Sequence, residues 1–568
     1  MIYQIFTRLF GNQNTTNAFY GSKDKNGVGK FNDITPTALA ALKEFGVSHV
    51  WYTGVIEHAT MTDYSEYGIK RDNPMVVKGK AGSPYAIKDY YDVDPDLAVD
   101  VDKRMEEFEA LVQRTHAAGM KALIDFVPNH VARQYASDKK PAGVQDFGEG
   151  DRTSVVFDQQ NNYYYLPNQA FHSPEGITSP VEVPQPYDEY PAKVTGNDVF
   201  NATPTINDWY ETIKLNYGVD YLSGRAKHFD PIPSTWLKMR DILIFWTRKG
   251  VDGFRCDMAE MVPVEFWGWV IPKIQEENPN IIFIAEIYNS YEYHSFIKEG
   301  KFDYLYDKVG LYNSLRPIVE GHGSVEDLTL LWQRESGDIS QNMLRFLENH
   351  DEQRIASTFF AKDPFAALPA MTLSATLHTG PMMIYFGQEV GVNPTEPEGF
   401  QGDDGRTTIF DYWGVVEFQK WVNGGKFDGG KLDDTQKKLR QYYHNLNHFV
   451  VGSEAIYAGK FYDLQYANID GQGPDYDKTR TYAYLRYTPK QRLLCVYNFD
   501  KTRTIHTRIK VPRHALVDSL GLDESSEYTL REVFPAAEFK TSVSGQELMN
   551  QGVPLTLPPM SHKIIQIN

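Results

Sequence analysis

Short apolar runs alternate with amphipathic helical patterns through most of the chain. The apolar runs have the length of strands, and between them apolar residues recur at helical spacing, as over residues 102–118. Counting the runs gives eight strands with intervening helices, which predicts an α/β fold built on a (β/α)8 TIM barrel. The expected strands are residues 2–6, 47–53, 122–127, 251–256, 281–287, 302–306, 343–347 and 382–386.

Two segments interrupt this alternation. Residues 131–231 are rich in Pro, Asn, Asp, Gly and Tyr, and because a structureless loop of that length is implausible, we expect a small domain inserted after strand three. From about residue 452 the pattern changes to period two, which predicts a C-terminal antiparallel β-sandwich. The expected layout is a barrel over 1–130 and 232–451, the inserted domain over 131–231, and the sandwich over 452–568.

Composition narrows the classes of function. The net charge of −18 disfavours nucleic-acid binding and suits a neutral ligand. No apolar run of about 18 residues is present, so no membrane span is expected. The first residues show no secretory signal pattern, which favours a cytoplasmic protein; a periplasmic or secreted protein whose signal was removed is the alternative. We expect a monomer. The two cysteines, Cys256 and Cys495, are expected to be buried free thiols.

Carboxylates stand at the ends of four predicted strands: Asp125, Asp257, Glu286 and Asp351. A carboxylate that ends a buried strand is costly unless it is paired or takes part in chemistry. Barrel enzymes place catalytic groups at the C-terminal ends of their strands. Four such residues on separate strands therefore indicate an active site.

The neighbours of two of these carboxylates predict different roles. Arg255 and Asp257 face the same side of one strand, and a nearby guanidinium favours the ionised form that a nucleophile needs. The apolar residues before Glu286 are expected to raise its pKa, which suits a general acid. Such a pair is what glycoside cleavage requires.

The motifs around these residues resemble those of the α-amylase family of glycoside hydrolases, over nearly the whole chain. They stand here as Asp125-Phe-Val-Pro-Asn-His130, Gly253-Phe-Arg-Cys-Asp257, Ile284-Ala-Glu286 and Phe346-Leu-Glu-Asn-His-Asp351. The resemblance implies that Asp257 is the nucleophile, Glu286 the acid/base, and Asp351 a third carboxylate that stabilises the transition state.

The same resemblance implies the substrate-binding residues. His130, Arg255 and His350 would bind the sugar ring at the cleavage point, and Tyr85 would stack beneath it unless it is a core tyrosine. Asp125 would anchor the loops at the strand ends. Arg354 matches a position that is often basic in the family, with a surface salt bridge as the alternative.

The implied activity is retaining hydrolysis of α-1,4-glucosidic bonds in starch-type glucans or maltooligosaccharides. Residues 258–261 lack the Lys-His pair of typical members, which weakens the case for a standard endo-amylase. The alternatives are a transglycosylase, a neopullulanase or cyclomaltodextrinase, or a sucrose- or trehalose-acting member. A non-catalytic carbohydrate-binding relative is disfavoured because all three catalytic carboxylates are present.

The chemistry needs no cofactor, and any bound calcium is expected to be structural. Asn129 matches a calcium ligand of the family. The loop that contains Asp24 and Asn26 resembles a calcium loop of oligosaccharide-cleaving relatives, although Lys30 replaces an expected carboxylate and a plain surface turn is the alternative.

Overall fold

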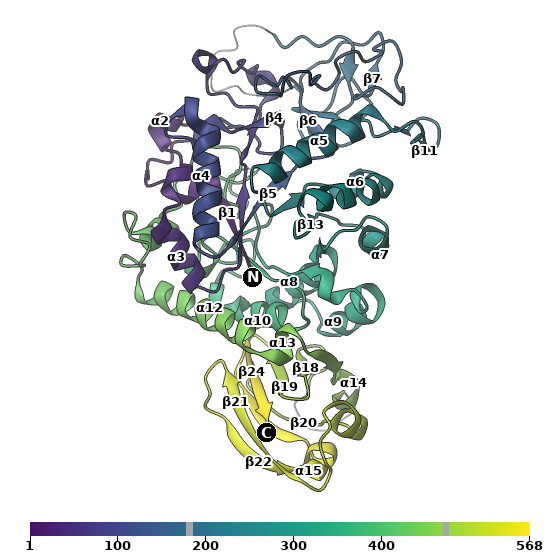
Figure 1. Cartoon of the computed structure of the whole chain (residues 1–568). Coiled ribbons are helices and arrows are strands. Elements are labelled where there is room, and N and C mark those ends of the chain that lie inside the picture. The colour runs from purple at the N-terminus through teal and green to yellow at the C-terminus, as the bar shows by residue number, and fades with distance from the viewer. Residues whose placement is uncertain (176, 178–185, 401, 470–475) are drawn as a thin grey trace.

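The computed structural model describes residues 1–175, 177, 186–400, 402–469 and 476–568. The barrel lies between the inserted segment at one end of the molecule and the C-terminal sheet at the other (Figure 1). In the described part of the chain, no helix combines the length and the apolar character that crossing a bilayer requires.

The barrel is an eight-stranded sheet in which every neighbouring pair of strands is parallel. A parallel bridge between Arg345 and Met382 closes it, because these residues adjoin β15 and β16, the two end strands of the sheet order. The predicted fold class is therefore confirmed. In chain order the strands are β1 (Ile2–Phe6), β2 (His49–Thr53), β5 (Lys121–Phe126), β12 (Gly253–Cys256), β13 (Ile282–Ala285), β14 (Tyr304–Tyr306), β15 (Met343–Leu344) and β16 (Met383–Tyr385).

Barrel strands are buried on both faces, which explains why they are nearly continuous apolar runs in the sequence. All five residues of β1 are buried, for example. The helices surround this sheet, as Figure 1 shows. The main ones are α3 (Pro36–Glu44), α4 (Arg104–Ala117), α5 (Ser234–Arg248), α6 (Val264–Glu277), α7 (Tyr293–Lys298), α8 (Asn313–Glu320), α10 (Leu368–Thr376) and α12 (Asp434–Gly452).

The inserted segment is held together by short antiparallel pairs and a small core of its own. The pairs are β6 (His130–Ala132) with β9 (Thr212–Lys214), β7 (Tyr165–Leu166) with β8 (Ala192–Lys193), and β10 (Val219–Asp220) with β11 (Ala226–Lys227). Tyr164, Leu166 and Phe171 are buried in the core of this segment. The exact limits of the inserted domain stay a prediction.

A second interruption of the barrel lies before the inserted segment, between β2 and α4. It was not predicted from the sequence. After β2 the chain forms an antiparallel pair, β3 (Ile56–His58) with β4 (Ile87–Val93). This pair leads from the end of β2 to α4 and carries Tyr85 just before β4.

The C-terminal region consists of two antiparallel sheets around a shared apolar core. The six-stranded sheet has the order β17 (Lys460–Asp463), β18 (Thr481–Tyr487), β19 (Arg492–Asn498), β24 (Ser561–Ile567), β21 (Glu527–Phe534) and β22 (Lys540–Ser544). The second sheet pairs β20 (Ile505–Ile509) with β23 (Val553–Leu557).

Alternate residues of β18 face the C-terminal core and the barrel. Ala483 and Leu485 lie in the C-terminal core. On the other face, Tyr484 shares a hydrogen bond of 2.6 Å with Thr376 of α10, and Arg486 donates to the Thr376 carbonyl at 2.7 Å. One face of the sheet is thus the contact surface with the barrel.

Candidate active site

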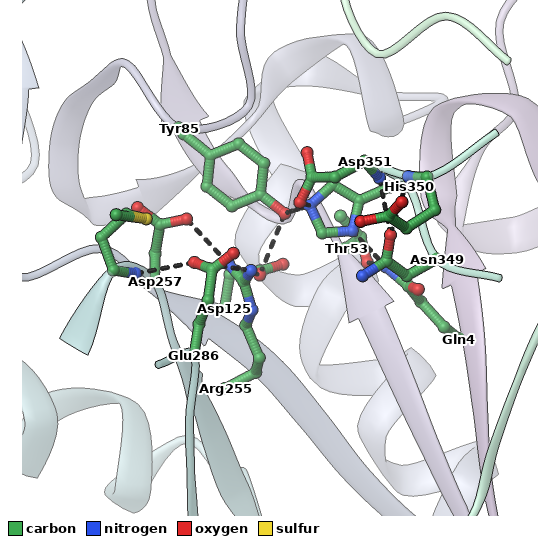
Figure 2. A network of polar contacts seen from close by, with 12 residues as sticks. Gln4, Thr53, Tyr85, Asp125, Arg255, Asp257, Glu286, Asn349, His350 and Asp351 are labelled. Atoms are coloured by element: carbon green, nitrogen blue, oxygen red, sulfur yellow. Dashed lines mark hydrogen bonds and ion pairs between the residues drawn. The ribbon is translucent and has the colours of Figure 1, made fainter. Parts of the chain in front are cut away.

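Asp257 and Glu286 follow the C-terminal ends of the neighbouring strands β12 and β13, at the same level of the barrel. In the register of β12 and β13, Cys256 lies opposite Ala285, so Asp257 and Glu286 follow directly after paired residues. Their side chains point toward each other and toward Arg255 (Figure 2). Both carboxylates are nearly inaccessible to solvent.

Arg255 contacts both of these groups. Its Nη1 donates to Asp257 Oδ1 at 2.8 Å, and its Nη2 forms an ion pair with Glu286 Oε2, also at 2.8 Å. A longer contact of 3.5 Å joins Nη1 to Asp125 Oδ1. The guanidinium is fully buried and therefore fixes the spacing of the two carboxylates.

The expected contrast between the two carboxylates is not present. Burial raises the pKa of Asp257, and Arg255 opposes that rise. Burial also raises the pKa of Glu286, where Arg255 again opposes it and Asp257 adds to it. Glu286 does not lie in an apolar pocket, because its oxygens accept polar contacts. Arg255 lies beside Asp257, as the strand alternation predicts, but it also contacts Glu286, which that alternation does not predict.

Two further donors orient Glu286. The hydroxyl of Tyr288 donates to Oε1 at 2.6 Å, and the backbone N–H of Met258 donates to Oε2 at 2.7 Å. Met258 has a φ of 43°, a left-handed conformation that a non-glycine residue adopts at a cost. This turn after Asp257 directs the N–H of Met258 at Glu286.

Asp351 is the most open of the three proposed catalytic carboxylates. Its side chain is 31% exposed, against 8% for Asp257 and 3% for Glu286. Burial and the charge of Glu286 raise its pKa well above the usual value. His350 Nε2 lies 3.1 Å from Asp351 Oδ2.

Tyr85 and His350 form a stacked pair beside the carboxylates. Their ring centroids are 5.2 Å apart, and the Tyr85 hydroxyl lies 2.5 Å from His350 Nε2 (Figure 2). The other ring nitrogen of His350 contacts Gln4 Nε2 at 2.8 Å. Burial and the charge of Arg255 lower the pKa of His350 well below its ordinary value, which favours the neutral ring.

Asp125 has the contacts of a structural anchor. It accepts hydrogen bonds from the Trp51 indole at 3.0 Å and the Tyr85 hydroxyl at 3.3 Å. His130 lies at the start of β6 with its ring 5.2 Å from the ring of Trp209, and burial lowers its pKa to about 4. The structure brings four of the five proposed substrate-binding residues together around the carboxylates: Tyr85, His130, Arg255 and His350.

Arg354 is the exception, and its assignment as a substrate-binding residue needs correction. Its side chain is fully buried, with Nη1 donating to Glu348 Oε2 at 2.8 Å and Nε donating to Thr407 Oγ1 at 2.9 Å. The guanidinium also lies 4.1 Å from the centre of the Tyr385 ring. It holds the loops after β15 and β16 together, so neither a substrate contact nor a surface salt bridge describes it.

The residues around Asn129 do not fit calcium. The Asn129 side-chain oxygen accepts a hydrogen bond from the Lys214 ammonium, which also pairs with Asp198 at 2.8 Å and donates to the Met261 carbonyl at 3.3 Å. A cation of the chain itself thus occupies the centre of these oxygens. In the N-terminal loop, Asp24 is exposed, whereas the Asn26 amide is buried and bonds backbone groups of Ala18 and Tyr412. These residues form a short helix, α2 (Lys23–Asn26), held by the contacts of Asn26.

Three residues near the site were not identified from the sequence. Tyr288 contacts Glu286, Tyr306 accepts a hydrogen bond from Arg255 Nε at 3.1 Å, and Trp209 faces His130. Strand parity could have found Tyr288, which lies two residues after Glu286. Trp209 comes from the inserted segment, and its position depends on tertiary packing.

Comparisons with known proteins agree with this geometry. Residues 4–409 match the family described as "Alpha amylase, catalytic domain". Alpha-amylase 3 of Dictyoglomus thermophilum is 24% identical over 396 residues, which cover 66% of this chain and 68% of that protein. A cyclomaltodextrinase of a Bacillus species is 22% identical over 508 residues, covering 88% of this chain and 73% of that protein.

A solved structure shows the same fold over the full length. The noncanonic maltogenic alpha-amylase AmyB from Thermotoga neapolitana superimposes with a TM-score of 0.61 at 19% identity, covering 100% of this chain and 98% of that chain. Because the family match spans most of the barrel and the inserted segment, the chain belongs to the α-amylase family of glycoside hydrolases.

Proposed function

We propose that this enzyme hydrolyses α-1,4-glucosidic bonds of maltooligosaccharides and starch-type glucans with retention of anomeric configuration. The observation that carries the proposal is the contact of one guanidinium, that of Arg255, with both Asp257 and Glu286 at 2.8 Å. Two carboxylates bound by the same guanidinium match the short separation of retaining enzymes, roughly 5–5.5 Å, better than the wider spacing of inverting ones.

In the first step, Glu286 acts as the acid and Asp257 as the nucleophile. A carboxyl oxygen of Asp257 attacks the anomeric carbon while the bond to the leaving oxygen breaks, and Glu286 gives its proton to that oxygen. Burial raises the pKa of both carboxyls, and Arg255 opposes the rise at both. The charge of Asp257 adds to the rise at Glu286, which favours Glu286 as the protonated member of the pair.

In the second step, Glu286 acts as a base. Its carboxylate takes a proton from a water molecule, whose oxygen attacks the anomeric carbon and releases Asp257. The donors from Tyr288 and Met258 stabilise Glu286 while it is ionised.

Asp351 and Tyr85 complete the proposed ring-binding site. Asp351 is the carboxylate most open to a ligand, so it is suited to accept hydrogen bonds from sugar hydroxyls. Tyr85 is 9% exposed and stacks on His350 close to the carboxylates, so a pyranose would pack against the part of its ring that stays accessible.

A cyclomaltodextrin-cleaving activity is the second candidate, because the relative that spans 88% of this chain bears the name cyclomaltodextrinase. A timed product profile on starch, pullulan, cyclodextrin, sucrose and maltooligosaccharides separates the candidates. Cleavage of cyclodextrin well ahead of linear maltooligosaccharides would favour the second, and cleavage of sucrose alone would contradict both.

Proton NMR of the first-formed sugar tests the mechanism. We expect an initial α-anomer from an α-linked substrate, whereas an initial β-anomer would mean inversion and would exclude Asp257 as the nucleophile. Asp257→Asn should lose at least about 10⁴-fold in kcat, since it removes the nucleophile, and should still bind maltooligosaccharide. Asp241→Asn, which alters an exposed carboxylate of α5, is the matched control and should retain full activity.

A further inference from the structure

A cluster of four carboxylates lies outside the active site, between the β3–β4 pair and the start of the inserted segment. It comprises Glu57 of β3, Asp89 and Asp92 of β4, and Asp138 of the loop after β6. Each residue offers an oxygen, and these oxygens all lie within 4.8 Å of one another. We call these four residues the acidic cluster.

The local backbone brings these groups together. Glu57 lies opposite Asp89 in the register, while the preceding residue, Ile56, lies opposite Val93. One step along β3 therefore corresponds to four steps along β4, and this bulge turns Asp92 to the same side as Asp89. Asp89 Oδ2 accepts hydrogen bonds from the N–H groups of Asp138 and Lys139 at 2.9 and 3.1 Å, which fixes the loop against the strand pair.

Glu57 is the unusual member of the cluster. Its side chain is 1% exposed, and no donor in the described part of the chain forms a hydrogen bond with either of its oxygens. A buried carboxylate without a partner is strongly disfavoured. Burial and the charges of Asp89 and Asp92 accordingly raise its pKa well above the usual value.

The charges around Glu57 are not balanced within the cluster. Arg104 donates to Asp92 Oδ2 at 2.9 and 2.6 Å and lies 3.8 Å from Asp138. The nearby Lys88 ammonium pairs with Asp72 at 3.0 Å instead. Four carboxylates therefore face one guanidinium.

We propose that the acidic cluster binds a calcium ion, with Glu57 as its central ligand. Calcium takes oxygen ligands at 2.3–2.6 Å, so ligands on opposite sides of the ion lie about 4.6–5.2 Å apart, which matches the spacing of the cluster. All the side chains supply oxygen and none supplies nitrogen or sulfur, which favours a hard cation over zinc or copper.

The position of the site gives the ion a structural role. Glu57, Asp89 and Asp92 belong to the β3–β4 pair, whereas Asp138 belongs to the inserted segment, so calcium would join the two. This site is separate from Asn129, where Lys214 supplies the cation, and from the exposed loop at Asp24.

Calcium binding to the full-length enzyme tests the proposal. The protein is stripped with EDTA, exchanged into metal-free buffer and titrated with Ca²⁺ by calorimetry, while its melting temperature is followed with and without the ion. We expect one ion per chain at this site and, at a hundredfold excess over Kd, a rise in Tm of about 2–3 °C.

Three variants assign the binding to these residues. Glu57→Gln removes the charge of the central ligand and keeps the size of its side chain. Asp138→Asn changes an exposed ligand and should have little effect on folding. Both variants should lose the calcium-dependent rise in Tm. Asp24→Asn is the matched control and should keep it. The proposal is overturned if the stripped wild type neither binds calcium nor gains stability. It is equally overturned if both Glu57→Gln and Asp138→Asn respond to calcium like the wild type, or if only Asp24→Asn loses the response.

Discussion

Arg255 determines how charge is distributed at the active site. Its guanidinium lies within 3.5 Å of Asp125, Asp257 and Glu286, and it is fully buried. Because both proposed catalytic carboxylates contact it, they titrate as a linked pair, and the pH profile of the enzyme reports the pair rather than either residue alone.

The Tyr288 hydroxyl should tune the acid of this pair. It donates to Glu286 Oε1 at 2.6 Å, and a hydrogen bond to the ionised form lowers the pKa of Glu286. Tyr288→Phe should therefore raise that pKa and move the alkaline limb of the kcat/KM profile upward, by up to about one pH unit.

The control for this profile is Tyr291→Phe, since the Tyr291 side chain is 93% exposed. A Tyr288→Phe profile that superimposes on the wild type, or that moves toward acid, would show that the hydroxyl does not stabilise the carboxylate.

Arg354 should matter for stability and not for substrate binding. Arg354→Met leaves Glu348 buried without its partner, which should cost about 3–5 kcal/mol of unfolding free energy. KM measured well below the lowered Tm should stay within about twofold of the wild-type value. Combining Arg354→Met with Glu348→Gln should recover part of the loss in chemical denaturation, because the uncompensated charge is removed.

The sequence allowed the identity of the site to be predicted but not its electrostatics. Asp257 and Glu286 directly follow apolar strands, and the motif around Asp351 resembles that of the family, so all three could be singled out as candidates. The surroundings of Glu286 could not, because Arg255 reaches it across strands and Met258 reaches it through a left-handed turn. The burial of Arg354 likewise depends on Thr407, which is distant in the sequence.

Among the elements, the pairing of β6 with β9 attaches the inserted segment to the barrel. His130 pairs with Lys214 in the register of these strands, next to Asn129. The Lys214 ammonium bonds oxygens of Asn129, Asp198 and Met261, which belong to the barrel and to the inserted segment. The Lys214 ammonium therefore binds the oxygens around Asn129, where the sequence suggested a calcium ion.

Lys214→Met should weaken this attachment. It leaves Asn129 and Asp198 without their donor, which should cost about 1–3 kcal/mol in urea denaturation. Lys227→Met, which changes an exposed lysine of β11, is the control and should cost little. Unchanged stability of Lys214→Met would mean that the ammonium does not hold the two parts together.

Element prediction succeeded where periodicity was strong and failed where it was absent. The barrel strands and α4 carry clear apolar patterns, and the structure contains them with shifted ends. The β3–β4 pair was missed because its strands contain Glu57, Lys88, Asp89 and Asp92, so they do not look like buried strands. The seventh strand was predicted over 343–347 but ends at Leu344, since Arg345 makes a single bridge that closes the barrel.

For the whole molecule, buried tyrosines help to form the interface between the barrel and the C-terminal sheet. Tyr484 and Tyr497 share hydrogen bonds with each other and with Thr376. Arg486 is fully buried there and donates to the carbonyls of Thr376, Ile456 and Gly459.

Arg486→Met should make the barrel and the C-terminal sheet unfold independently. The substitution leaves buried carbonyls without a donor, so the C-terminal sheet should melt separately from the barrel in differential scanning calorimetry. Arg513→Met, which alters an exposed arginine of the same region, should melt like the wild type. A single transition at the wild-type temperature for Arg486→Met would contradict this role.

Because the barrel closes through its first and last strands, one edge of β1 stays unpaired during most of the synthesis of the chain. β1 pairs with β16 through Ile2 and Met383, which are 381 positions apart. At roughly 5–20 residues per second, a ribosome needs roughly 20–75 s to supply the strand that covers this edge of β1. Until then, the backbone groups on that edge can pair with other nascent chains. We therefore expect chaperones to protect this enzyme chiefly during its synthesis and to be dispensable once β16 is in place.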